Sequence, residues 1–300
     1  MRFTNSRLGD FAKDPAVARF HGRYWLYYTV MYHDRKTIGI GIASSDDMEN
    51  WSDLGEMEIT QECEKNGVGA PAAIVIGGRL HLFYQSYGNG KRDAICHAVS
   101  NDGVSFVKDE SNPVFRPTDD WCCGRAIDAD VIAYNDRLML YFATRDHDMK
   151  IQKLGCASAP LGSDYSRSDF RQEVIGSILS PELVWEQECI EAPAAVDIGG
   201  RVYMFYGGAY NCRPLQIGCA VSSDGIHFDR ISGEPFYKNG GPGSWNASES
   251  GHPYAFRDDD GKVYLFFQGS PNNGKNWYLS RMEIGFGEDG KPYIIRVCDE

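Results

Sequence analysis

The chain has 300 residues, of which 30 are Lys or Arg and 42 are Asp or Glu, so its formal net charge is −12. This acidic balance argues against a nucleic-acid partner and leaves no basic patch for an anionic membrane. With 42% hydrophobic and 13% aromatic residues the chain can build a large core, yet no apolar stretch approaches the ~20 residues that a membrane-spanning helix requires.

A hairpin pattern recurs along the chain. Each copy has a short apolar strand, a tight turn with Gly, Asn or Asp, and a nearly continuous apolar and aromatic second strand, as in "DPAVARFHGRYWLYYT" and "APAAVDIGGRVYMFYGG". The five copies begin at Asp14, Ala70, Asp128, Ala192 and His252, so the period is 56 to 64 residues. Repeats of about 40–60 residues are typical of propellers and solenoids.

A third strand rich in Gly, Ala and Cys follows each hairpin, for example "TIGIGIAS" and "QIGCAVS". Turn signals come next in "SNDGVSF" and "SSDGIHF", and more loosely in "SSDDMENW", with an aromatic residue that would begin a fourth, outer strand. Four strands in each repeat predict an all-β fold, a five-bladed β-propeller with four antiparallel strands per blade. We expect one domain over residues 1–300, because a single blade cannot bury its own faces.

The cysteines and the first residues bear on the compartment. Nine cysteines are present, an odd number, and none forms a Cys-x-x-Cys pair. Cys96, Cys156 and Cys219 fall at similar places in third strands, where small buried side chains are expected. The start, "MRFTNSRLGDFAKDP", has no signal-peptide apolar core. We therefore expect a cytoplasmic location, or secretion if a leader has been trimmed from the sequence.

The residues that begin the five repeats should meet at one end of the channel, because the innermost strands of a propeller line its axis. Three of them are ionisable, Asp14, Asp128 and His252, and Glu191 comes one step before the fourth. Like charges in a partly buried site push pKa values apart, so one acid can stay protonated while another stays ionised. Glycoside hydrolysis needs this division between a proton donor and a carboxylate that activates water or attacks directly.

The chain resembles glycoside hydrolase family 43 and its wider clan of five-bladed propellers. The motifs "KDPAV", "AIDADV", "IEAPAA" and "SGHPY" carry the resemblance, which covers about residues 10–297. It implies that Asp14 is the general base, that Asp128 orients the acid and raises its pKa, and that Glu191 is the general acid. It also implies hydrolysis of oligosaccharides that releases arabinofuranose or xylose with inversion. Inversion needs a separation of roughly 6.5–9.5 Å between the carboxyls of Asp14 and Glu191.

The resemblance also places His252 at the floor of the channel, where several members of that family bind a Ca²⁺ ion or a water beneath the sugar. Because Ca²⁺ prefers oxygen ligands, an ion there would be held mainly by waters, with His252 as one contact. We expect no required cofactor, with Ca²⁺ as the one metal that the resemblance admits.

Two motifs depart from the family's usual pattern. In "IDAD" an Ala stands where Pro more often follows the Asp, so Asp130 competes with Asp128; strand alternation would put both on one face, and the alignment of the repeats favours Asp128. "EAP" replaces the more usual "EGP", and the extra methyl beside Glu191 bears on the width of the sugar site. Glu186 and Glu188 are weaker rivals of Glu191, expected in a solvated loop.

Polar loops between second and third strands should open at the same end as the ring. They are rich in Asn, Asp, Arg and Tyr, and Arg145 and Arg213 are candidates for contacts with sugar hydroxyls. The loops between blades carry Trp121, Trp185 and Trp245, whose faces either stack on a sugar ring or pack within the protein. These residues, with the histidine of the ring, are the expected substrate-binding side chains.

Other functions stay open at this point. A clan relative that cleaves fructans or sucrose would use Asp14 as a nucleophile and retain configuration, and a glycoside phosphorylase would show Arg and His clustered for phosphate. A catalytically inactive sugar-binding propeller would have lost one of the ring acids, and all three are present. The sequence has no Gly-rich phosphate loop, no nucleophile elbow and no zinc-type spacing. The oligosaccharide is the expected partner, and the oligomeric state is open.

Overall fold

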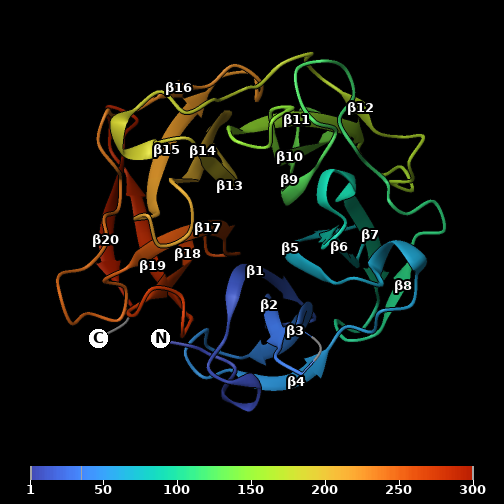
Figure 1. Cartoon of the computed structure of the whole chain (residues 1–300), viewed down its shortest axis with the longest axis horizontal. Helices are drawn as coiled ribbons and strands as arrows, with labels where there is room; N and C mark the ends of the chain where they lie inside the picture. The colour runs from blue at the N-terminus through green and yellow to red at the C-terminus, as the bar shows by residue number, and fades with distance from the viewer. Residues whose placement is uncertain (1, 35, 299–300) are drawn as a thin grey trace.

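The computed structural model describes residues 2–34 and 36–298, and its strands form five antiparallel sheets of four strands each. Figure 1 shows the sheets arranged in chain order as blades around a central axis. The predicted all-β, five-bladed propeller is therefore confirmed. Within the described residues, no helix has the length and apolar character that crossing a membrane requires.

Each blade follows the strand order of the sequence from the axis outward. The innermost strands are β1 (Lys13–Phe20), β5 (Val68–Ile76), β9 (Ile127–Tyr134), β13 (Ile190–Ile198) and β17 (Glu249–Arg257). The second strands are β2 (Arg23–Tyr32), β6 (Arg79–Ser86), β10 (Arg137–Arg145), β14 (Arg201–Gly208) and β18 (Val263–Ser270).

The third and fourth strands complete the blades. The third strands are β3 (Thr37–Ser45), β7 (Ile95–Ser100), β11 (Gln152–Pro160), β15 (Gln216–Ser222) and β19 (Tyr278–Phe286). The outer strands are β4 (Ser52–Glu56), β8 (Phe106–Lys108), β12 (Arg171–Gln172), β16 (Asp229–Arg230) and β20 (Pro292–Val297). Short 3₁₀ turns are η1 (Ser6–Leu8), η2 (Glu62–Glu64), η3 (Gly90–Arg92) and η4 (Val184–Glu186).

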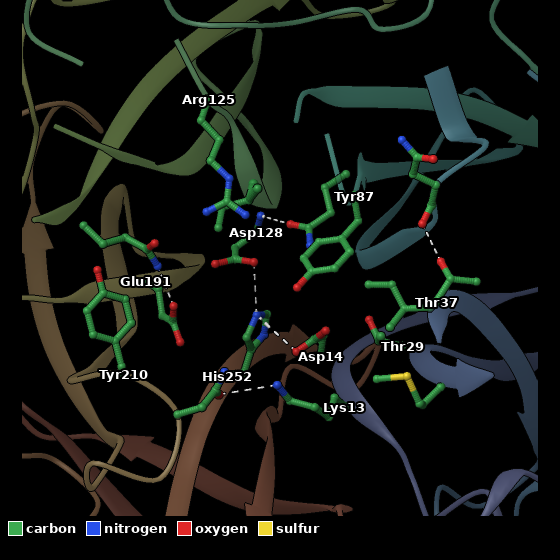
Figure 2. A pocket seen from close by; sticks show the side chains of 18 of the residues that line it. Lys13, Asp14, Thr29, Thr37, Tyr87, Arg125, Asp128, Glu191, Tyr210 and His252 are labelled. Atoms are coloured by element: carbon green, nitrogen blue, oxygen red, sulfur yellow. Dashed lines mark hydrogen bonds and ion pairs between the residues drawn. The ribbon is translucent and has the colours of Figure 1, made fainter. Parts of the chain in front are cut away.

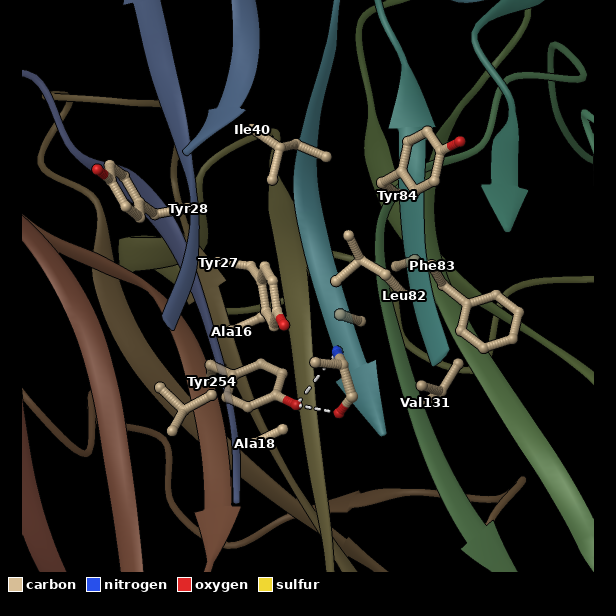
Figure 3. Close-up of a cluster of buried hydrophobic side chains, with 14 of the residues drawn as sticks. Ala16, Ala18, Tyr27, Tyr28, Ile40, Leu82, Phe83, Tyr84, Val131 and Tyr254 are labelled. Carbon is tan, nitrogen blue, oxygen red and sulfur yellow. Dashed lines mark hydrogen bonds between the residues drawn. The ribbon is translucent and has the colours of Figure 1, made fainter. Parts of the chain in front are cut away.

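The second strands supply much of the core, because they are buried on both faces between neighbouring blades. Figure 3 shows Tyr27 and Ile40 of the first blade in one cluster with Leu82 of the second. The small residues of the third strands admit the large ones of the second: a Cβ on Gly218 would lie 2.4 Å from Cζ of Tyr206. The alternation of aromatic and small strands therefore sets the spacing within each blade.

The N-terminal segment closes the ring of blades. The backbone N–H of Phe3 donates to the carbonyl of Leu279 at 2.8 Å, and Phe11 forms an isolated bridge with Trp277. Both partners belong to or adjoin the third strand of the last blade, so the first residues of the chain bind the end of the propeller to its beginning.

A β-bulge interrupts every innermost strand at the residue that begins the sequence repeat, and the pairing with the second strand shifts there in all five blades. The five bulge residues have left-handed φ angles of 43° to 52°, and they are Asp14, Ala70, Asp128, Ala192 and His252. Such a backbone disfavours a non-glycine residue by roughly 1–2 kcal/mol. A bulge changes the direction in which its side chain points, and the five bulges lie at the same end of the channel.

Side chains of neighbouring blades accept the backbone N–H of three of these bulge residues, which are Asp14, Ala70 and Asp128. For Ala70 the acceptor is Oγ1 of Thr29 in β2, at 2.8 Å. Oε1 of Gln268 in β18 accepts the backbone N–H of Asp14 at 2.9 Å, and Oε1 of Gln85 in β6 accepts that of Asp128 at 2.8 Å. The backbone donors that the bulges remove from the sheet are therefore satisfied, and both aspartates are fixed relative to the adjacent blade.

Candidate active site

A cavity of about 410 Å³ opens at the bulges of Asp14, Asp128 and His252. Asp14 from β1, Asp128 from β9, Glu191 from β13 and His252 from β17 all line it. Figure 2 shows the four side chains directed toward one another from separate blades. The fold therefore brings together the ionisable residues whose convergence the sequence repeat predicted.

The loops between second and third strands form part of the wall, as predicted. Lys36 comes from the β2–β3 loop, Tyr87 from the β6–β7 loop, and Tyr210 and Asn211 from the β14–β15 loop. Arg145 at the end of β10 also lines the cavity. These polar and aromatic groups lie around an opening whose floor is the ring.

His252 lies between the two aspartates. Its Nε2 is 3.3 Å from Oδ1 of Asp14 and 3.4 Å from Oδ1 of Asp128. Burial alone would lower the pKa of His252, but the carboxylates of Asp14 and Asp128 outweigh it and raise the pKa to about 9. The imidazole is therefore a cation at neutral pH.

The three acids have different environments. Burial would raise the pKa of Asp128, but the hydrogen bond and charge of His252 outweigh it and hold the pKa below its usual value. The pKa of Glu191 is instead raised to about 7, first by burial and then by the negative charge of Asp128. The raised pKa of Glu191 agrees with the expectation, and the cavity holds one acid that binds its proton more tightly than usual beside one that is ionised.

The ring of side chains as they stand disfavours direct ligation of a metal by His252. A ligating histidine must offer a neutral nitrogen, whereas Nε2 of His252 holds a proton between two carboxylates. Within the described part of the chain, no group of three or more His, Cys, Asp or Glu side chains could hold a metal ion. A Ca²⁺ ion held mainly by waters stays a prediction that chelation can test.

The sequence reasoning did not select three of the cations that line the cavity, which are Lys36, Arg125 and Lys13. Nε of Arg125 donates to Oδ2 of the buried Asp93 at 3.0 Å, so an ion pair with a residue outside the described cavity lining holds its guanidinium in place. Nζ of Lys13 lies 4.4 Å from the ring centroid of Trp277. The only sequence signal for Lys13 was its place directly before Asp14 in "KDPAV".

The three candidate tryptophans pack within the protein. Trp185 stacks on Tyr206 with ring centroids 6.0 Å apart, Trp121 packs near Phe142 at 6.4 Å, and Trp245 packs on a phenylalanine at 5.6 Å. None of the three is among the described residues that line the cavity. Of the two roles expected for them, packing within the protein therefore agrees with the structure, and their proposed place as substrate-binding residues is corrected to the loops that pack against the blades.

The two candidate arginines differ in position. Arg145 lines the cavity, whereas Arg213 is exposed and lies outside the described lining residues. The backbone carbonyl of Arg213, not its side chain, accepts a hydrogen bond from Gln187. Of the two, only Arg145 is positioned to contact a ligand in this cavity.

Asp130 and Asp128 do not share an environment, although strand alternation predicted that they would. Asp128 lines the cavity, but Oδ2 of Asp130 accepts the backbone N–H of Ala195 at 2.6 Å and lies outside the described lining. The bulge with left-handed φ at Asp128 breaks the two-residue alternation. The preference for Asp128 therefore agrees with the structure, while the argument from alternation was wrong.

Glu186 is not in a solvated loop. Its side chain is fully buried, and Oε1 accepts from the hydroxyl of Tyr206 at 2.7 Å and from Nε of Arg230 at 2.8 Å. Glu188 is exposed, as expected. Neither lines the cavity among the described residues, so Glu191 has no rival in this stretch.

A buried acid with a raised pKa beside an ionised one, at one end of a five-bladed propeller, is the arrangement that a glycoside hydrolase requires. The particular family follows from comparison. The model of glycosyl hydrolases family 43 matches residues 3–292, so the chain belongs to glycoside hydrolase family 43.

Solved structures share the fold over nearly the whole chain. An endo-1,4-β-xylanase from Bacteroides thetaiotaomicron has a TM-score of 0.74 at 19% identity and covers 95% of this chain and 94% of its own. An α-L-arabinofuranosidase from Lactobacillus brevis has a TM-score of 0.72 at 14% identity, covering 94% and 93%. An exo-1,5-α-L-arabinanase from a bovine ruminal metagenomic library has a TM-score of 0.72 at 20% identity, covering 98% and 100%.

Proposed function

We propose that this protein removes terminal arabinofuranosyl or xylosyl units from oligosaccharides by inverting acid/base hydrolysis. The observation that carries the proposal is the division among the acids of one cavity: Glu191 has a pKa of about 7, while the pKa of Asp128 is held below its usual value by His252. Arabinose- and xylose-processing names among the similar structures support the choice of sugar.

The reaction uses the cavity residues in separate roles. Glu191 donates its proton to the glycosidic oxygen as the bond to the anomeric carbon breaks. Asp14 takes a proton from the water that attacks the opposite face of that carbon. Asp128 supplies the negative charge that keeps Glu191 protonated, and His252 holds Asp14 and Asp128 in place. No covalent intermediate forms.

The test is a screen of nitrophenyl glycosides, followed by NMR that resolves the anomer released first. We expect cleavage of an arabinofuranoside or xyloside with inversion. Release with retention would instead assign Asp14 as a nucleophile, as in the fructan-cleaving relatives of the clan. Sugar binding without turnover of any glycoside would identify an inactive binding propeller.

A phosphorylase is the second candidate, and one observation favours it. Besides the acids, the cavity is lined by several cationic side chains, and they are Lys13, Lys36, Arg125, Arg145 and His252. Such a set suits a phosphate co-substrate. The same NMR experiment, run with and without inorganic phosphate, decides between hydrolysis and phosphorolysis. Formation of a sugar 1-phosphate would identify the protein as a phosphorylase.

A further inference from the structure

Gln152 is a buried polar side chain that contacts Glu191 and has no role in the mechanism so far. It begins β11, its side chain is fully buried, and it lines the cavity. Its Nε2 donates to Oε2 of Glu191, and its Oε1 accepts from Nε of Arg145 at 2.7 Å. The amide therefore connects a cation on one strand to the candidate acid on the next blade.

The direction of this connection is fixed by chemistry. An arginine side chain can only donate hydrogen bonds, so the amide oxygen of Gln152 must face Arg145. The NH₂ group must then face Glu191, whichever way the amide would otherwise turn. Arg145 and Gln152 are direct cross-strand partners at the end of the β10–β11 pair, so the backbone register holds them together.

Arg145 is itself held at the edge of the cavity. Its guanidinium lies 5.1 Å from the ring centroid of Tyr210, and Nη1 lies 3.4 Å from the carbonyl of Met149. The hydroxyl of Tyr210 donates to the carbonyl of Lys150 at 2.7 Å. These contacts leave the guanidinium little freedom to release Gln152.

Both donors near the Glu191 carboxyl approach the same oxygen. Besides Gln152, the thiol of Cys189 lies 3.7 Å from Oε2. An oxygen that accepts an N–H is a poor place for the carboxyl proton, so the proton belongs on Oε1. We propose that Gln152, oriented by Arg145, is a positioning residue that keeps the acidic proton of Glu191 on Oε1, available to the glycosidic oxygen. This rests on the proposed role of Glu191 as the general acid.

The charged groups around Glu191 determine what removal of Gln152 does. Burial, Asp128 and Glu249 raise the pKa of Glu191, while His252 and Lys13 lower it. Arg145 lies beyond Gln152 and the thiol of Cys189 stays neutral, since burial raises its pKa. An N–H donated to Oε2 favours the ionised carboxylate, so its loss would raise the pKa of Glu191 further while leaving the proton unplaced.

The experiment compares Gln152→Leu with Gln216→Leu. Gln216 also begins a third strand, β15, but lies outside the described lining of the cavity. In Gln152→Leu we expect kcat/KM on a glycoside with a poor leaving group to fall about 10- to 100-fold, the loss of one hydrogen bond to an ionisable group. An activated aryl glycoside should lose much less. The basic limb of the pH profile should move to higher pH, and Gln216→Leu should leave it in place.

A ¹³C NMR titration of the Glu191 carboxyl gives the same comparison without a substrate. An upward shift of its midpoint in Gln152→Leu supports the inference even if the sugar has been misassigned. Arg145→Met removes the group that orients the Gln152 amide but keeps the amide itself. It should shift the midpoint in the same direction by a smaller amount. This variant replaces Gln152→Leu in the test if the leucine variant does not fold. An unchanged midpoint with equal losses on both substrates overturns the inference. Absence of glycoside cleavage by the wild-type protein would instead overturn the proposed function.

Discussion

Nε2 of His252 lies 3.4 Å from Oδ1 of Asp128, and the pair joins two blades across the channel. The resemblance to the family implied a water or a Ca²⁺ contact at His252, and here the imidazole faces the carboxylates of Asp14 and Asp128. Its positive charge lowers the pKa of Asp128 despite burial, and Asp128 in turn raises that of Glu191. His252 also lowers the pKa of Glu191, so the two pKa values differ because, of these two acids, only Asp128 pairs directly with the imidazole, while burial and the charge of Asp128 raise the pKa of Glu191.

His252→Gln should lower kcat/KM on every substrate, because it leaves the carboxylates of Asp14 and Asp128 facing each other without a cation. A loss of about 10²-fold is expected, at the lower end of the range for groups that act on proton transfer. Because the imidazole already holds a proton, incubation with EDTA should leave the wild-type rate unchanged. Both effects are measured by steady-state kinetics on the best nitrophenyl glycoside from the screen.

The control for this variant is His227→Gln, since the His227 side chain is 82% exposed and pairs with the surface residue Asp224. It should keep the wild-type rate. If EDTA abolished activity and Ca²⁺ restored it, the expected insensitivity to EDTA would be wrong and a metal in the channel would be required for activity.

The pH dependence of kcat/KM should follow Glu191. The active form is protonated, and its pKa is about 7, so the rate should fall as pH rises through about 7. The charge of His252 is lost only near pH 9, where its pKa lies, and cannot produce that limb. The profile should be measured on a glycoside whose leaving group needs protonation. A rate that stays level to pH 8 and falls near 9 would assign the limb to His252 instead.

Glu186→Gln should destabilise the protein, because it removes the charge that pairs with Arg230 in the core. Breaking a buried ion pair typically lowers the free energy of unfolding by about 3 kcal/mol or more. Burial would raise the pKa of Glu186, but Arg230 outweighs it and the pKa is lowered. A carboxylate whose pKa is lowered by folding stabilises the folded state at pH values above its unfolded pKa of about 4.3. The difference in free energy of unfolding between the wild-type protein and Glu186→Gln should therefore become smaller in acid.

Urea unfolding at neutral and acidic pH measures this effect, with Glu188→Gln as the control. Glu188 is exposed, so the same substitution two residues away should change stability by no more than about 0.5 kcal/mol. Equal stability of the two variants would mean that the Glu186 pair is not formed in solution.

The fold and the ring were predictable because the internal repeat reports them directly. Five copies of one hairpin fix the blade number, and equivalent positions in the copies must lie at one end of the axis, as Asp14, Asp128 and His252 do. Neither the prediction of the fold nor that of the ring depends on loop conformations, which the sequence does not reveal. The bulge was not predictable, because a left-handed φ at Asp128 is not encoded by strand alternation.

Other features depended on contacts between blades, which no spacing in the sequence reveals. Trp185 was a candidate for sugar stacking, yet it fits over Gly208, where a Cβ would lie 2.1 Å from its Cζ3. Gln152 carried no motif at all, and its role comes from its cross-strand pairing with Arg145 and its contact with Glu191 of the next blade. Sequence reasoning therefore found the acids but not the buried amide that contacts Glu191.

The separate roles of Glu191 and Asp14 can be distinguished by the leaving group. A nitrophenolate departs without protonation, so Glu191→Ala should lose little rate on an aryl glycoside and about 10²–10⁴-fold on a natural oligosaccharide. Asp14→Ala should lose a similar factor on both, because water must be activated whichever group leaves. Steady-state kinetics of the two variants on one aryl glycoside and one oligosaccharide gives the comparison. If Glu191→Ala lost the same factor on both substrates, Glu191 would not be the general acid, and wild-type rates on the oligosaccharide would leave it with no catalytic role.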